Sequence, residues 1–103
     1  MVVDVDLTTE PPTVALDDPE DCKAFSLRVR GDRAGLGGAL EAGRVGRMDG
    51  EEALVGVDAV RRLAVGRVGP GWEGDFAAML DYAATKGWIA DDGRAIRAHI
   101  EEA

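Results

Sequence analysis

Three glycines in the middle of the chain match the spacing of a phosphate-binding loop. Gly69, Gly71 and Gly74 satisfy GxGxxG, follow the apolar run LAVGRV and open a predicted helix. Asp91 or Asp92 follows about twenty residues later, where a dinucleotide-binding fold places the acid that binds the ribose. In such folds the loop holds a pyrophosphate against the helix N-terminus. The chemistry of this motif would therefore be nucleotide binding.

Neighbouring residues argue against nucleotide binding. Trp72 and Glu73 would bring bulk and negative charge into the loop that must accept a phosphate. Residues 88–90 are too short for a second parallel strand, and no chain remains to complete a dinucleotide-binding sheet. We therefore expect no cofactor and interpret the glycines as a connector followed by a capped helix.

Other reactive side chains are few. His99 is the only histidine, whereas zinc sites generally use three or four histidine, cysteine or carboxylate ligands. Cys22 is the only cysteine, and its neighbours Glu20 and Asp21 disfavour the thiolate. We predict no catalytic residue and no metal site. The sequence leaves open whether the chain is an enzyme, and this scarcity argues against it.

Three arginines form the first candidate interaction surface. Arg28 and Arg30 share one face of a predicted strand, and Arg47 on a predicted hairpin can extend them into a basic strip. The same residues would also suit a solvated sheet face, or a surface that binds the chain's own acidic N-terminal segment.

Three aromatic residues form the second candidate surface: Trp72, Tyr82 and Trp88. Tyr82 lies off the apolar stripe of its predicted helix, and aromatic residues are enriched at protein interfaces. The alternative is that these rings belong to the core or to its rim.

The stretch from Gly69 to Trp88 predicts the main helix of the core. Pro70 suits the first turn, and Lys86 followed by Gly87 ends the helix, after which Trp88 can fold back onto it. Apolar residues recur at spacings of three and four, which places them on one face of this helix: Trp72, Phe76, Met79, Leu80, Ala83 and Ala84.

The remaining patterns predict an α+β fold. They indicate a strand over Phe25–Arg30, a helix from Arg33 to Ala42 capped by Asp32, a hairpin of Arg44–Met48 and Ala53–Val57 around Asp49-Gly50, a short helix capped by Asp58, and a last helix from Asp91 or Asp92 with Ile96 and Ile100 on its buried side. We therefore expect a small three-stranded, mainly antiparallel sheet with helices packed on one face, in the order β-α-β-β-α-α-α.

The acidity of the chain is concentrated at its start. The net charge is −8, and residues 1–24 hold seven acids against the single base Lys23. With three prolines and no helical period, residues 1–24 are expected to be a flexible acidic arm, although VVDVDL also fits an edge strand. Residues 25–103 are expected to form one α+β domain.

Charge and hydropathy also bear on partners and location. Basic residues nearly balance acidic ones outside the arm, which argues against binding to nucleic acid or to a membrane surface. No apolar run approaches the ~20 residues that span a bilayer, and no leader is evident, so we expect a cytoplasmic protein.

Three functions fit these observations. The first is a small non-catalytic protein–protein interaction module, either an accessory subunit of a larger enzyme or a homodimer. The alternative is a small-molecule-binding protein or small enzyme, with a pocket between sheet and helices lined by Trp72, Trp88 and an arginine such as Arg28. The third is an acidic mimic that occupies a basic nucleic-acid-binding surface through residues 1–24.

Overall fold

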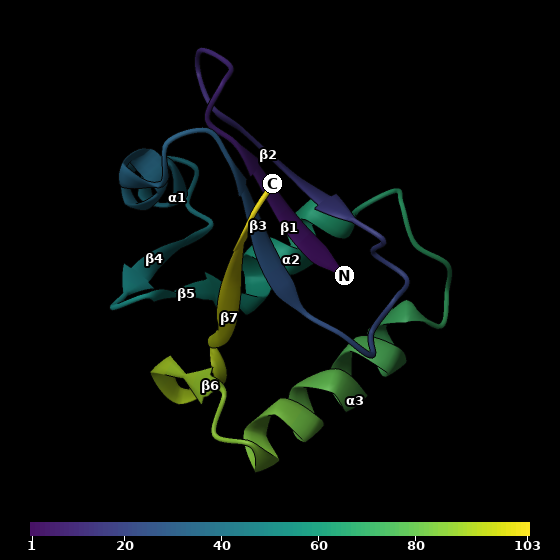
Figure 1. Cartoon of the computed structure of the whole chain (residues 1–103). Helices are drawn as coiled ribbons and strands as arrows, with labels where there is room; N and C mark the ends of the chain where they lie inside the picture. Colours follow the sequence, from purple (N-terminus) through teal and green to yellow (C-terminus); the bar gives the residue numbers. More distant parts are fainter.

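The computed structural model describes residues 1–103 and contains a seven-stranded mixed sheet with three α-helices (Figure 1). The strands are β1 Val2–Asp6, β2 Thr13–Asp17, β3 Ser26–Arg30, β4 Gly46–Asp49, β5 Glu52–Gly56, β6 Ile89–Ala90 and β7 Ala95–Glu102. The helices are α1 Leu36–Ala42, α2 Val57–Ala64 and α3 Trp72–Thr85, with 3-10 turns at Arg33–Gly35 and Asp91–Gly93. The fold class is α+β, but the expected three-stranded, mainly antiparallel sheet is wrong.

The strand β7 joins the two parts of the sheet, whose order is β2-β1-β3-β7-β5-β4. Residues 99–102 of β7 pair in parallel with β3, whereas residues 95–98 pair antiparallel with β5. The short strand β6 pairs antiparallel with residues 95–96. The pair β1–β3 is also parallel, and the pairs β1–β2 and β4–β5 are antiparallel. The last strand of the chain is therefore central to the sheet.

β7 replaces the helix that was expected at the C-terminus. Ile96 and Ile100 are four residues apart, which suits one face of a helix but also one face of a strand. With Ala98 they are buried, while the residues between them face away from the core. Asp91 and Asp92 have φ values of 54° and 56° and belong to a turn rather than to a helix cap.

Residues 1–24, expected to be a flexible arm, supply two of the additional strands. β1 lies between β2 and β3, and its side chains Val3 and Val5 are fully buried. The acids that alternate with them lie on the other face of the sheet, where Asp4 is the register partner of Arg28 and Asp6 that of Arg30. Two acids of the segment, Asp4 and Asp17, form ion pairs with the arginines of β3, which balances part of its negative charge.

Other local predictions are confirmed. Asp32 caps the turn before α1, because its Oδ1 accepts a hydrogen bond of 2.9 Å from the amide of Ala34. The Asp49-Gly50 hairpin forms between β4 and β5. At Gly46 a Cβ atom would lie 2.0 Å from the carbonyl oxygen of Leu54, so only glycine allows the two strands this close.

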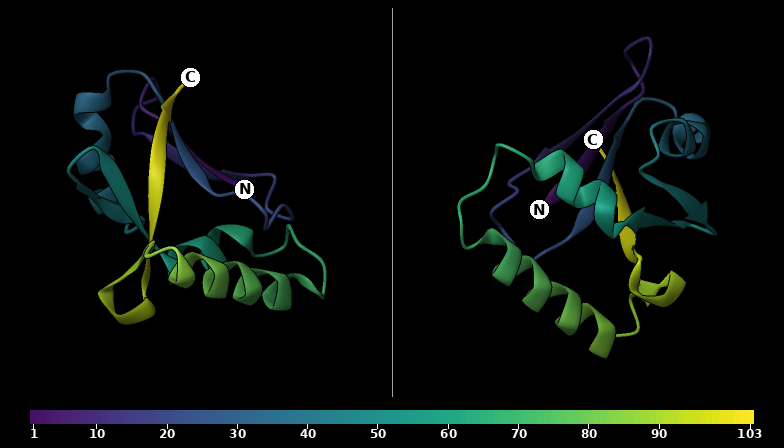
Figure 2. Two further views of the ribbon diagram at one scale, coloured as in Figure 1. Left: turned by 60° about the horizontal axis from the view of Figure 1, so that its bottom comes forward. Right: turned by 180° about the vertical axis from the view of Figure 1, so that it is seen from behind.

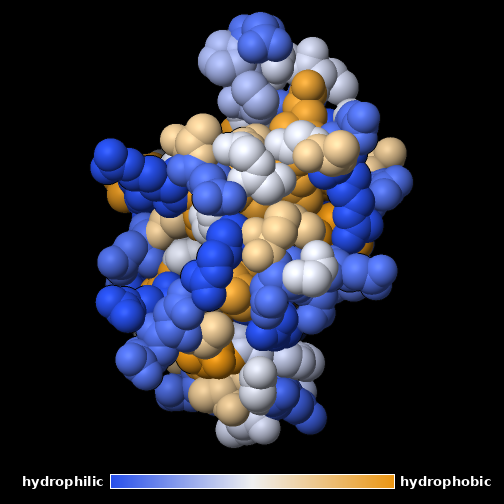
Figure 3. Space-filling model, turned by 90° about the vertical axis from the view of Figure 1, so that its left-hand side faces the viewer, coloured by the Kyte–Doolittle hydropathy of each residue, from blue (hydrophilic) through white to orange (hydrophobic).

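The helices surround one continuous apolar core. α2 crosses the back of the sheet and α3 runs along one end of it, while α1 lies beside β4 (Figures 1 and 2). On the side that carries α1 and β4, hydrophilic side chains surround and separate the apolar ones (Figure 3). None of the helices has the length and apolar character needed to cross a membrane.

Candidate functional site

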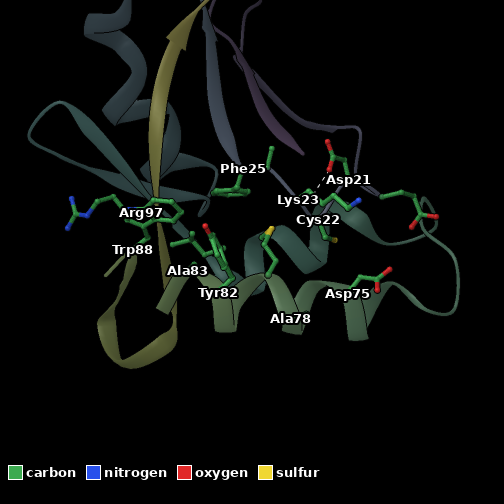
Figure 4. A pocket seen from close by; sticks show the side chains of 14 residues that line it. Asp21, Cys22, Lys23, Phe25, Asp75, Ala78, Tyr82, Ala83, Trp88 and Arg97 are labelled. Atoms are coloured by element: carbon green, nitrogen blue, oxygen red, sulfur yellow. Dashed lines mark hydrogen bonds between the residues drawn. The ribbon is translucent and has the colours of Figure 1, made fainter. Parts of the chain in front are cut away.

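A groove of about 930 Å³ runs between α3 and the segment that connects β2 to β3 (Figure 4). One wall is formed by residues 20–25, and Trp88, Ile96 and Arg97 lie at one end. The other wall is a face of α3 formed by Asp75, Ala78, Met79, Tyr82 and Ala83. We call this feature the α3 groove.

The helix α3 presents two different faces. Trp72 and Phe76 point into the core, where their rings stack with centroids 4.7 Å apart at an interplanar angle of 12°. Asp75, Met79 and Tyr82 follow at spacings of four and three, which places them on the adjacent face that lines the groove. One helix therefore supplies both core and groove.

The end of α3 fixes the position of Trp88. Gly87 has a φ of +76°, which closes a Schellman motif: the amide of Trp88 donates to the carbonyl of Ala83 at 3.0 Å and that of Gly87 to Ala84 at 3.2 Å. The carbonyl of Trp88 then accepts a hydrogen bond of 2.7 Å from the amide of Arg97 on β7. The backbone of Trp88 is therefore hydrogen-bonded to the end of α3 on one side and to β7 on the other.

Two aromatic rings stand exposed at this end of the groove. Tyr82 is 58% exposed and Trp88 is 45% exposed, and their rings meet edge to face with centroids 6.2 Å apart. The side chain of Tyr82 therefore lies outside the face of α3 that packs against the core. Trp72, the third aromatic residue of the predicted surface, is only 5% exposed and belongs to the core.

The opposite wall of the groove is anchored at several points. The Nε1 of Trp72 donates a hydrogen bond of 2.6 Å to the carbonyl of Pro19. The backbone nitrogen of Met1 donates to the carbonyls of Asp21 and Ala24 at 3.0 and 3.1 Å. The groove is therefore formed before anything binds in it.

Charged groups of the groove are mostly acidic. Glu20, Asp21 and Asp75 line it, and Asp75 makes no ion pair. Burial raises the pKa of the Cys22 thiol, and the nearby carboxylate of Asp75 raises it further. Of the two basic residues that line the groove, Arg97 is paired and Lys23 makes no ion pair.

Arg97 lines the groove but is already engaged elsewhere. Its guanidinium pairs with Asp49 at 2.9 Å and with Glu52 at 3.5 Å, and it points away from the groove (Figure 4). It therefore adds little positive charge to the groove itself.

The three arginines of the predicted basic strip lie outside the groove and are paired. Arg28 contacts Asp4 at 3.0 Å and also Asp17, and Arg30 contacts Asp4 at 3.2 Å. These acids come from residues 1–24, so this face binds the chain's own acidic segment.

The guanidinium of Arg47 makes a bidentate contact with the carboxylate of Asp91, donating two hydrogen bonds of 2.6 and 3.1 Å. Hydrogen bonding from Arg47 lowers the pKa of the Asp91 carboxyl. Each of the three arginines is thus already paired with an internal carboxylate.

The glycine motif has no phosphate-binding context in the structure. The segment before Gly69 follows the helix α2 rather than a strand. Around Gly74 the space for a Cβ atom is open, so no close backbone approach requires a glycine there. The amide of Gly69 is directed at the carboxylate of Glu20.

The structure keeps the thiol of Cys22 apart from His99, and Ser26, the register partner of His99 in β3, makes no side-chain hydrogen bond to it. Cys22 lies in the α3 groove, whereas His99 is exposed on the face of β7 that points away from the core. No group of three or more histidine, cysteine or acidic side chains is arranged to hold a metal ion. What the α3 groove offers is apolar contact, two aromatic edges and carboxylates.

Sequence reasoning identified the aromatic end of the groove but missed its other residues. The spacing of Asp75, Met79 and Tyr82 is a signal that could have shown a second helix face. The wall that includes Cys22 and Phe25 has no such signal, because the composition of residues 1–24 predicts an arm outside the domain.

Comparison with known proteins adds no relative, since no protein-family model, curated protein or solved structure matches this chain.

Proposed function

We propose that this chain is a small non-catalytic protein–protein interaction module whose docking surface is the α3 groove. The observation that carries the proposal is the exposed pair of Tyr82 and Trp88 at one end of an apolar groove. Large aromatic side chains at a formed, partly desolvated site are the residues that most often dominate binding energy at protein interfaces. Neither ring belongs to the buried core or to the apolar side chains packed against it.

The rigidity of the site supports the same proposal. Trp88 is held by the Schellman motif and by β7, and the facing wall is held by bonds from Trp72 and Met1. A preformed groove avoids the entropy cost of ordering its walls when a partner binds. The accessory-subunit and homodimer forms of the proposal both use this surface.

The test is recovery of the protein with a C-terminal tag from its native host. The expected result is a stoichiometric partner that accompanies the wild type and is lost from the double variant Tyr82→Ala/Trp88→Ala. Val65→Ser is the matched control, because Val65 is 77% exposed and lies outside the groove. Retention of the partner by the double variant would show that its binding surface is elsewhere.

A second candidate function is binding of a small molecule in the same groove. Its volume of about 930 Å³ falls within the roughly 300–1,000 Å³ of typical ligand sites. Trp88 lines it, but Trp72 is buried and Arg28 lies outside it, so the expected lining is only partly present. A metabolite that raises the melting temperature of the wild type, but not of Trp88→Ala, would favour this function.

A further inference from the structure

The two ends of the α3 groove differ in chemistry. Tyr82 and Trp88 lie at one end, whereas Asp21 and Asp75 lie at the other, on opposite walls, with Lys23 next to Asp21 (Figure 4). Between them the floor is apolar, with Met79 and Phe25 partly buried against the core. A segment that fills this groove would need apolar side chains for one end and cationic groups for the other.

The carboxylates at the acidic end are available to a partner. Asp75 makes no ion pair and no hydrogen bond through its side chain, and it is exposed. Asp21 accepts from the amide of Lys23 at 3.0 Å through one oxygen, and its other oxygen forms a long ion pair of 3.8 Å with the charged nitrogen of Met1. Each therefore retains lone pairs that can accept from an incoming lysine or arginine.

The charge of the whole molecule favours the same kind of partner. The net charge is −8, and the arginines of the sheet are paired with internal carboxylates. The resulting field attracts a basic segment and repels a second copy of this acidic chain. Charge complementarity thus selects a basic heterologous partner over self-association.

The length of the groove limits the occupant to a short segment. Asp75 and Tyr82 are seven residues apart in α3, which corresponds to about 10 Å along the helix axis. Two helical turns, or three to four extended residues, cover about that distance. The walls are a helix and an irregular segment without a free strand edge, so side chains must supply most of the contacts.

We propose that the α3 groove binds a short basic segment of a partner polypeptide. Apolar side chains of that segment pack against Tyr82 and Trp88, and its lysine or arginine side chains contact Asp21 and Asp75. This inference rests on the proposed function and adds to it the chemical class of the partner.

The test is selection of a random peptide library, displayed on phage, against the immobilised full-length protein. Enriched peptides are expected to combine apolar or aromatic residues with adjacent lysine or arginine. The corresponding synthetic peptides should slow the reaction of Cys22 with a maleimide at alkaline pH, because Cys22 lines the groove and is the only cysteine. They should also bind at least about tenfold more weakly to Tyr82→Ala/Trp88→Ala, as expected for interface aromatic residues.

Isosteric variants test the electrostatic part. Asp21→Asn and Asp75→Asn should each weaken binding by about two- to fivefold and reduce its salt dependence, as exposed ion pairs do. Asp81→Asn is the matched control, because Asp81 is exposed on α3 outside the groove. Near-ultraviolet circular dichroism of each variant shows whether the fold is retained.

The outcomes separate this inference from the proposed function. Peptides that need Tyr82 and Trp88 but carry no basic residue would overturn the inference and leave the docking groove intact. A groove-dependent homodimer, seen by light scattering, would overturn it in favour of a second copy. Peptides that bind without protecting Cys22, or a selection without any enriched sequence, would overturn both.

Discussion

The reactivity of the Cys22 thiol reports on the environment inside the α3 groove. Cys22 is partly buried in it and is the only thiol of the chain. Burial is the main reason that its pKa is raised, and the carboxylate of Asp75 adds to the effect. A raised pKa leaves less thiolate at any given pH, so the thiol reacts more slowly than an unhindered cysteine.

Replacing Asp75 with asparagine should make Cys22 more reactive. The rate of alkylation by iodoacetamide is expected to rise with pH through a midpoint above that of an ordinary thiol. In Asp75→Asn the midpoint should move to lower pH, because one repulsive charge is removed, yet remain above the ordinary value because burial persists. Asp81→Asn should leave the profile unchanged. Identical midpoints in the wild type and Asp75→Asn would exclude electrostatic coupling across the groove.

At the scale of elements, α3 was the most predictable part of the chain. Its apolar spacing and Gly87 after its end are local signals, and the helix at Trp72–Thr85 agrees with them. Pro70, expected in the first turn, instead precedes the N-cap Gly71. The Asp49-Gly50 hairpin is equally local. Such elements depend on neighbours within a few residues, so the sequence alone contains the information that positions them.

The C-terminal strand was not predictable in this way. A spacing of four between Ile96 and Ile100 fits both the period of a helix and the alternation of a strand. Ala98 between them is a small residue and does not distinguish a helix from a strand. What selects the strand is pairing with β3, β5 and β6, which come from distant parts of the chain. Tertiary pairing therefore overrides a locally ambiguous pattern.

The C-terminal cap of α3 positions Trp88 at the end of the groove. The contribution of its glycine, Gly87, to stability can be measured by substitution. Gly87→Ala should lower the free energy of unfolding by about 1 kcal/mol, because alanine is strained at a φ of +76° although the space around Gly87 is open. Gly87→Asn should cost less, since asparagine tolerates this conformation better. Gly74→Ala, in the open first turn of α3, should instead be neutral or stabilising by up to about 1 kcal/mol. Urea unfolding followed by circular dichroism compares the three variants, and equal stabilities would argue against the Schellman cap.

At the scale of the whole molecule, residues 1–24 decide what kind of sheet forms. Their acids and prolines suggested an arm, since local composition alone favours disorder. In the structure, Asp4 and Asp17 face Arg28, and the alternating valines of β1 enter the core. The compensating positive charges are Arg28 and Arg30 of β3. The sequence of residues 1–24 alone gives no sign of this pairing. For the same reason, no local pattern predicts the groove wall at residues 20–25.

Deleting residues 1–24 should therefore abolish cooperative folding rather than trim an arm. The deletion removes β1 and β2, uncovers the edge of β3 and takes four fully or almost fully buried side chains from the core: Met1, Val3, Val5 and Leu16. Loss of even one such side chain is costly, so Leu16→Ala should lower the free energy of unfolding by roughly 2–5 kcal/mol. A domain of this size has only about 5–15 kcal/mol in total.

The matched control on the same strand is Ala15→Ser, because Ala15 is exposed and its neighbour Leu16 is buried. It should change stability by no more than about 0.5 kcal/mol. Thermal unfolding followed by near-ultraviolet circular dichroism distinguishes the two interpretations of the segment. A deletion variant that keeps the native spectrum and a sharp transition would support the flexible-arm interpretation. A Leu16→Ala variant as stable as Ala15→Ser would show that Leu16 of β2 contributes little to the core. Residues 20–25 also form one wall of the α3 groove. We therefore expect the first quarter of the chain to be required for binding in the groove as well as for folding.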